Sequence, residues 1–165
     1  MSAQRLFPFF VMISLLAVTG IAARSGDDGS EFKASLTGAE EVPSVVTTTT
    51  GRAEFEVNSA QTQIKFELKV REATDILAAA GAHIHCAPKG VNGPIVAFLA
   101  GVVTGGFDGK VEIEATLTGA NITNPLCGAT IADLVQSMKD GNTYVNVHSA
   151  AHPGGEARGQ IVEDD

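Results

Sequence analysis

Histidine is the residue type in this chain whose spacing points most directly to chemistry, and the chain has only four histidines. His83 and His85 alternate within Gly81–Cys86, a stretch typical of a β-strand, so both side chains leave the same face. Same-face neighbours lie roughly 6.5 to 7 Å apart in a strand. Two imidazoles at that spacing can bind one metal ion, because a metal–nitrogen bond measures about 2.0 to 2.1 Å. We predict a metal site here, with structural, hydrogen-bonded histidines as the alternative.

A third histidine follows the same rule in Tyr144–His148, where the valines point to one side of the predicted strand and His148 leaves the other. If the two strands are neighbours, His83, His85 and His148 form a cluster on the outer face of the sheet. Three histidines with one open coordination position suit Zn or Cu. His152, in the turn that follows, is either a fourth ligand or a solvated turn residue.

Charged residues of the last predicted strand share a face as well. Glu156 and Arg158 lie two residues apart, and Glu156 is a candidate to orient a histidine by accepting its second N–H. The favoured alternative for Glu156 is an ion pair with Arg158 or a structural pair with Glu40 or Glu41. No Ser-His-Asp set, phosphate-binding loop, Cys-x-x-Cys motif or dinucleotide-binding glycine loop is present, so the sequence gives no support to a nucleophilic hydrolase.

The two cysteines, Cys86 and Cys127, predict a disulfide if the protein is exported, because thiols oxidise outside the cytosol. The alternative is a pair of metal-binding thiolates, since Cys86 directly follows His85. Asn121 begins the triplet Asn-Ile-Thr, which is an N-glycosylation site if the host modifies its secreted proteins.

Period-two alternation of apolar and polar residues predicts the elements that position these side chains. The segment Thr130–Lys139 departs from it: its apolar residues have helical spacing, Thr130 is a candidate cap, and Gly141 lies beyond the end. Seven or eight short strands with one short helix predict an all-β fold, either a β-sandwich or a flattened barrel. The expected strands lie at 32–36, 52–57, 62–70, 81–86, 94–99, 110–117, 144–148 and 156–162.

The start of the chain is typical of a secretory signal peptide at residues 1–23: Arg5, then an apolar run, then small residues. An uncleaved membrane anchor is the alternative. A flexible leader at 24–30 and one domain at 31–165 follow. The formal net charge of −8, with no basic cluster, argues against nucleic acid and anionic lipid as partners. We expect a secreted, extracellular protein, periplasmic in a Gram-negative host, with no membrane contact after cleavage.

The segments that carry the histidines resemble the CHRD (chordin-type) domain. One departure from the family pattern is Ala157, where the family usually has a larger aliphatic residue. The matching segments span about 32–162 and are, in order, Leu36–Pro43 (LTGAEEVP), Ala82–His85 (AHIH), Gly93–Val96 (GPIV), Asp133-Leu134, Tyr144–His148 (YVNVH) and Pro153–Gln160 (PGGEARGQ).

This resemblance implies an extracellular β-sandwich with an immunoglobulin-like outline. The His-x-His strand is also similar to the copper-ligand strand of Cu,Zn superoxide dismutase, another β-sandwich, although the bridging histidine and zinc loop of that enzyme have no clear counterpart here. We therefore expect a secreted CHRD-domain protein that binds Cu or Zn through surface histidines. The alternative is a non-enzymatic module that binds an extracellular protein or matrix; a dismutase-type enzyme ranks behind both.

Overall fold

The chain folds into one antiparallel β-sheet with a single α-helix, in a computed structural model that describes residues 29–164. The strand order is β5-β4-β7-β8-β1-β2-β3-β6, and β9 pairs with β1. The all-β prediction is confirmed; there are nine strands because the expected last strand divides into β8 and β9. The bounds are β1 Glu31–Thr37, β2 Thr50–Val57, β3 Gln63–Ile76, β4 Ala82–Cys86, β5 Ile95–Ala100, β6 Phe107–Thr118, α1 Ile131–Lys139, β7 Thr143–Val147, β8 Ala157–Gln160 and β9 Val162–Glu163.

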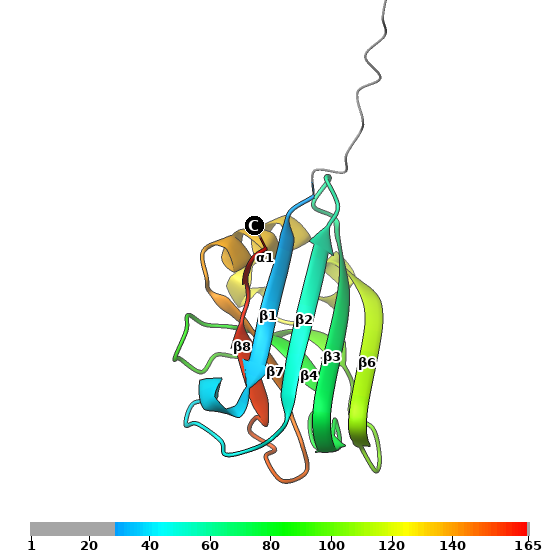
Figure 1. Ribbon diagram of the computed structural model, residues 1–165. Helices are drawn as coiled ribbons and strands as arrows, with labels where there is room; N and C mark the ends of the chain where they lie inside the picture. The colour runs from blue at the N-terminus through cyan, green and yellow to red at the C-terminus, as the bar shows by residue number, and fades with distance from the viewer. Residues whose placement is uncertain (1–28, 165) are drawn as a thin grey trace, which may run out of the picture.

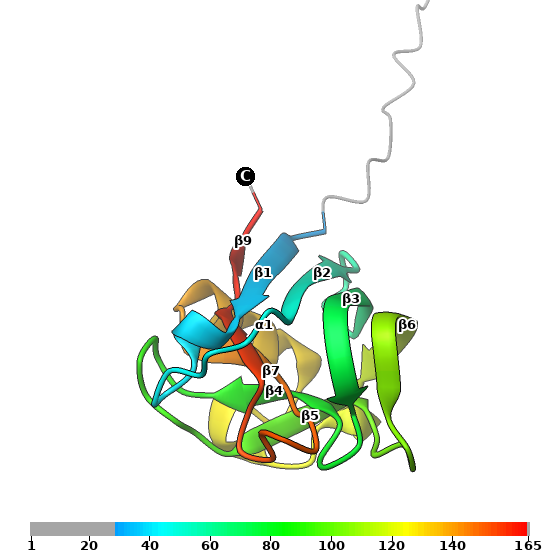
Figure 2. The same ribbon diagram turned by 60° about the horizontal axis from the view of Figure 1, so that its bottom comes forward.

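The sheet curls on itself, so that β1, β2, β3 and β6 form the front layer and β8, β7 and β4 pass behind it (Figure 1). The layers join where β1 meets β8, through the pair Thr37 and Arg158. Figure 2 shows β4 and β5 lying across from the front strands. An isolated bridge from Ala97 to Ile122 links β5 to the segment after β6. The result is a nearly closed, flattened barrel rather than two separate sheets.

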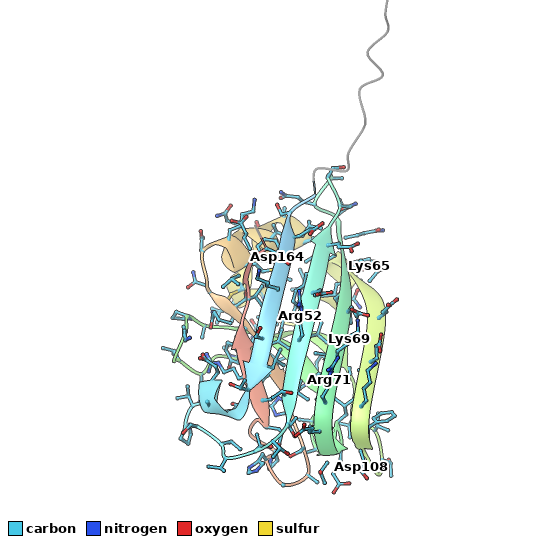
Figure 3. All side chains as sticks on the ribbon, in the orientation of Figure 1. Arg52, Lys65, Lys69, Arg71, Asp108 and Asp164 are labelled. Atoms are coloured by element: carbon cyan, nitrogen blue, oxygen red, sulfur yellow. A yellow bond between two sulfur atoms is a disulfide. The ribbon has the colours of Figure 1, made fainter. Side chains whose placement is uncertain are left out.

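Strand alternation fills the space between the layers with apolar side chains. Phe55 on β2 lies opposite Phe66 on β3, and Ile84 and Val145 of the rear layer belong to the same core. The outer face of the front layer carries charged residues instead, including Arg52 and others labelled in Figure 3. The rear layer has a different outer face, and the candidate site lies there.

The helix α1 forms as predicted. Thr130 Oγ1 accepts a hydrogen bond from the backbone N–H of Asp133, whose carboxylate accepts one from Thr130 N–H in return. Gly141 lies beyond the end and donates its N–H to the carbonyl oxygen of Met138. Four buried residues of α1 join the core. Within residues 29–164, this nine-residue helix is the longest, and no helix there is long and apolar enough to cross a bilayer.

Cys86 and Cys127 form the predicted disulfide, with their Cα atoms 5.6 Å apart, so the thiolate alternative is not realised. The bond ties the end of β4, one residue after His85, to the short 3-10 turn Pro125–Cys127 that precedes α1. Asn121 lies on the surface, and its side-chain oxygen accepts a hydrogen bond from Thr118 N–H. The predicted signal peptide and residues 24–28 of the predicted leader lie outside the described residues.

Candidate metal centre

The register of β4 and β7 brings the two histidine-bearing segments together. His83 pairs with Asn146, and His85 pairs with Tyr144, across an antiparallel ladder. His148 follows β7 directly and donates its backbone N–H to Gly81 O at 3.0 Å. Because cross-strand partners point to the same side, the three imidazoles share the outer face of the rear layer. The two histidine-bearing strands are therefore neighbours in the sheet, as the cluster requires.

The three histidines converge on one point. One ring nitrogen of each of His83, His85 and His148 lies within 4.8 Å of the others. The ring centroids of His83 and His148 are 5.0 Å apart, and those of His83 and His85 are 5.6 Å apart. Nitrogens that share a metal ion lie about 3.3 to 3.6 Å apart, given bonds of about 2.0 to 2.1 Å. Small side-chain movements therefore suffice to close the cluster around an ion.

Backbone carbonyls fix which nitrogen of two of these histidines is available. His85 Nδ1 lies 2.9 Å from Gly93 O, and His148 Nδ1 lies 3.1 Å from Pro153 O. A carbonyl oxygen only accepts hydrogen bonds, so each Nδ1 carries the proton and each Nε2 keeps a lone pair. Metal-binding histidines are held in the same way, with the second nitrogen bonded to a carbonyl or carboxylate.

Buried nitrogens without partners are the clearest sign that the cluster suits a ligand. Both ring nitrogens of His83 and the Nε2 atoms of His85 and His148 are buried without a well-aligned hydrogen-bond partner within the described residues, although the backbone of Ala80 acts weakly on the His83 ring. A buried polar atom left unpaired costs about 1 to 3 kcal/mol. A metal ion bound to one nitrogen of each histidine would satisfy three of these four atoms at once.

The electrostatics keep the imidazoles neutral. Burial lowers the pKa of His83 and of His85 from 6.5 to about 4, and the neighbouring imidazole of His148 acts on both in the same direction. Burial also lowers the pKa of His148. All three side chains are therefore uncharged near pH 7, which is the form that donates a lone pair to a metal ion.

The prediction that these are surface histidines is wrong. The exposed fractions are only 1% for His83, 8% for His85 and 5% for His148. Strand parity places them on the outer face correctly, but parity says nothing about what covers that face. Two loops supply the cover, 87–94 through Gly93 and 149–155 through Pro153, and the ring of Phe98 stands edge-on to His83 at 4.6 Å.

The remaining predicted site residues lie beside the cluster rather than in it. His152 Nε2 is 3.8 Å from Glu156 Oε2, and its side chain is 38% exposed. Glu156 also accepts hydrogen bonds from Ser149 Oγ, at 2.6 Å, and from Thr47 Oγ1. Although burial acts to raise it, these hydrogen bonds lower the pKa of Glu156. The histidines of the cluster are therefore oriented by two backbone carbonyls and not by Glu156. Glu156 instead links the loop that carries Thr47 to the loop that carries Ser149.

A stack of three side chains, formed by His85, Tyr144 and Arg158, is the feature that sequence reasoning missed. The ring of Tyr144 lies parallel to that of His85, with centroids 4.8 Å apart and 14° between planes. The guanidinium of Arg158 lies over the Tyr144 ring, 3.5 Å from its centroid. The shared parity of Tyr144 and Arg158 with the histidines was the available signal, but only the β7–β8 pairing brings them into contact.

A buried carboxyl group, that of Glu41, lies on the His83 side of the histidine cluster. Glu41, in the loop after β1, accepts a hydrogen bond from Asn146 Nδ2 at 3.4 Å, and its Oε1 has no partner within the described residues. Burial raises the pKa of Glu41 from 4.5 to about 7, although the positive charge of Arg158 acts to lower it. Asn146 connects Glu41 to His83, its cross-strand neighbour.

The fold and site define a class: a curled antiparallel β-sheet with a buried cluster of three histidines on its rear layer. Comparison with known families gives the family. The family model of the CHRD domain matches residues 32–161. This range contains strands β1 to β8, except for the first residue of β1, and leaves out β9. The chain therefore belongs to the CHRD-domain family. No curated protein matches the chain significantly. The local similarity to Cu,Zn superoxide dismutase stays a prediction.

Proposed function

We propose that this CHRD-domain protein is secreted and binds one transition metal ion, Cu or Zn, through His83, His85 and His148. The observation that carries the proposal is the convergence of three buried nitrogens within 4.8 Å, at positions where no group of the described residues satisfies them. Imidazole is a good ligand for both metals. The proposal concerns binding, and it assigns no catalytic step to the site.

Secretion rests on separate grounds: the signal-like start of the sequence and the Cys86–Cys127 disulfide, a bond that persists in oxidising compartments. Expression of the full chain with a C-terminal tag in a secreting host tests it. We expect the protein in the medium or periplasm, without residues 1–23 by mass spectrometry. Retention in the cytosol at full length would contradict this half of the proposal.

Metal content after purification without chelators is the direct test of binding. We expect about one equivalent of Cu or Zn by elemental analysis, and less than about a tenth of that in His83→Ala, His85→Ala and His148→Ala variants, because three ligands act together. His152→Ala is the matched control, since His152 lies outside the cluster and should keep the metal.

Two results would count against binding at this cluster. Wild-type protein that stays metal-free after incubation with Cu or Zn favours the structural alternative, in which the histidines only pack the rear layer. Equal metal content in His85→Ala and wild type, with both proteins folded by circular dichroism, would place the metal elsewhere.

A further inference from the structure

A buried positive charge lies close behind the proposed metal site. Arg158 is only 2% exposed, and its guanidinium stacks on Tyr144, which in turn stacks on the ligand His85. A cation so near a site for another cation requires an explanation, because the two repel each other in a medium of low dielectric constant. Given the proposed function, on which this inference rests, Arg158 must affect which ion the cluster accepts.

The groups that hold Arg158 do not cancel its charge. Its Nη1 donates to Asn92 Oδ1 at 3.0 Å, and its Nη2 donates to the carbonyl oxygens of Val91, at 2.8 Å, and Pro88, at 3.5 Å. All three acceptors are neutral. Within residues 29–164, Arg158 forms no ion pair with a carboxylate. Glu41 interacts with Arg158 electrostatically without forming an ion pair, so the positive charge of the guanidinium is only partly compensated inside the rear layer.

The metal ligands supply no compensating charge either. The three imidazoles are neutral donors, and among the described residues no carboxylate belongs to the cluster. Two buried carboxyl groups lie beside it: Glu156 accepts hydrogen bonds from Ser149 and Thr47, and Glu41 accepts one from Asn146 and interacts electrostatically with Arg158. An ion in this site would keep its full formal charge, unless it brought an anion with it into a covered space.

From this arrangement we propose that the cluster selects a monovalent metal ion, Cu(I), over the divalent ions Zn(II) and Cu(II). The cost of burying an ion rises with the square of its charge, and repulsion by Arg158 rises in proportion to it. Three imidazole nitrogens give Cu(I) a complete coordination shell, whereas Zn(II) usually takes a fourth ligand. At a separation on the order of 10 Å and an effective dielectric constant of about 20, Arg158 alone disfavours the second positive charge roughly tenfold.

The reduction potential of bound copper isolates the charge effect, because the metal and its ligands stay the same. We expect Arg158→Gln to lower the Cu(II)/Cu(I) potential, measured by titration of the Cu(II) electron paramagnetic resonance signal, by an amount that corresponds to roughly tenfold weaker preference for Cu(I). For one electron, tenfold equals about 59 mV. Arg158→Lys keeps the charge and should keep most of the potential, and Arg52→Gln, an exposed arginine on β2, is the matched control. An unchanged potential in Arg158→Gln would overturn the proposal.

A competition between Cu(I) and Zn(II) for the wild-type protein provides a second, independent test of the proposal. Metal-free protein is mixed anaerobically with equal, excess Cu(I) and Zn(II), desalted and analysed for both metals. Copper in the protein at about one equivalent, with little zinc, supports the selection. Zinc as the main ion overturns it and leaves metal binding intact, whereas neither metal bound would contradict the proposed function itself. This arm decides between the ions if Arg158→Gln does not fold.

Discussion

His83 shows most clearly how burial decides the chemistry of a residue here. It is the most deeply buried of the three cluster histidines, and neither of its nitrogens has a well-aligned hydrogen-bond partner within the described residues. His85 and His148 are instead oriented by loop carbonyls. The metal-free cluster is thus a set of neutral bases that protonates only with difficulty, which makes the stability of the metal-free protein depend on pH.

The sign of that dependence follows from the pKa values. The pKa of His83 and of His85 is about 4 in the folded chain and near 6.5 when unfolded, so the unfolded state binds more protons between these values. We expect the free energy of unfolding, from urea titrations of metal-free protein, to fall as pH drops from 6.5 through 4. Each histidine contributes at most about 1.4 kcal/mol per pH unit.

Glu41 acts in the opposite direction. The pKa of Glu41 is about 7 in the folded chain and 4.5 in the unfolded chain. The stability that protonated Glu41 contributes to the folded state is therefore fully present below pH 4.5 and is lost as pH rises through 7. Glu41→Gln should therefore steepen the rise of stability between pH 4.5 and 6.5, while a His83→Ala/His85→Ala double variant should flatten it. The same slope in the wild type and both variants would show that these groups do not titrate with these pKa values.

At the scale of elements, two devices hold the histidine strand in place. The β4–β7 ladder sets which side chains face each other, and the Cys86–Cys127 disulfide anchors the end of β4 beside α1. The covering loop 87–94 starts directly at that disulfide and carries Gly93, the acceptor for His85. The bond therefore fixes both the ligand strand and the loop that orients one ligand.

Removal of the disulfide tests this role. The two cysteines are separated by 41 positions in the sequence, and closing a loop of that size contributes roughly 3 to 4 kcal/mol in the chain-entropy account. We expect Cys86→Ser/Cys127→Ser to lose about that much stability in chemical denaturation. A reductant should destabilise the wild type to the same level and leave the double variant unaffected. A double variant as stable as oxidised wild type would contradict this expectation.

At the scale of the molecule, the curled sheet separates two outer faces. The front layer exposes a charged face to solvent (Figure 3), while loops from distant parts of the sequence cover the rear face. Glu41 comes from the loop after β1, and Pro153 comes from the turn before β8. A metal ion held there would connect β4 and β7 beneath those loops, so binding should stabilise the whole fold.

The expected measure is the melting temperature. An ion that binds the folded state at about 100 times its dissociation constant adds about 2.7 kcal/mol, provided that it does not bind the unfolded chain. We expect Cu(I), added anaerobically, to raise the melting temperature of wild-type protein by at least several degrees, and a copper chelator to reverse the rise. His148→Ala should show no shift. An equal shift in that variant would mean that copper acts outside the cluster.

The sequence alone determined the central part of each element and its inward face, because alternation and helical spacing are local properties that a short window records. It did not predict that β3 continues past Val70 to Ile76, where the register with β6 shifts. It also determined that His83, His85 and His148 share a side of their strands. Tertiary structure decided three further points: that β4 and β7 are neighbours, that loops 87–94 and 149–155 bury the cluster, and that Arg158 stacks on Tyr144. Strand order and loop paths depend on contacts between distant residues, and no local pattern in one sequence encodes them.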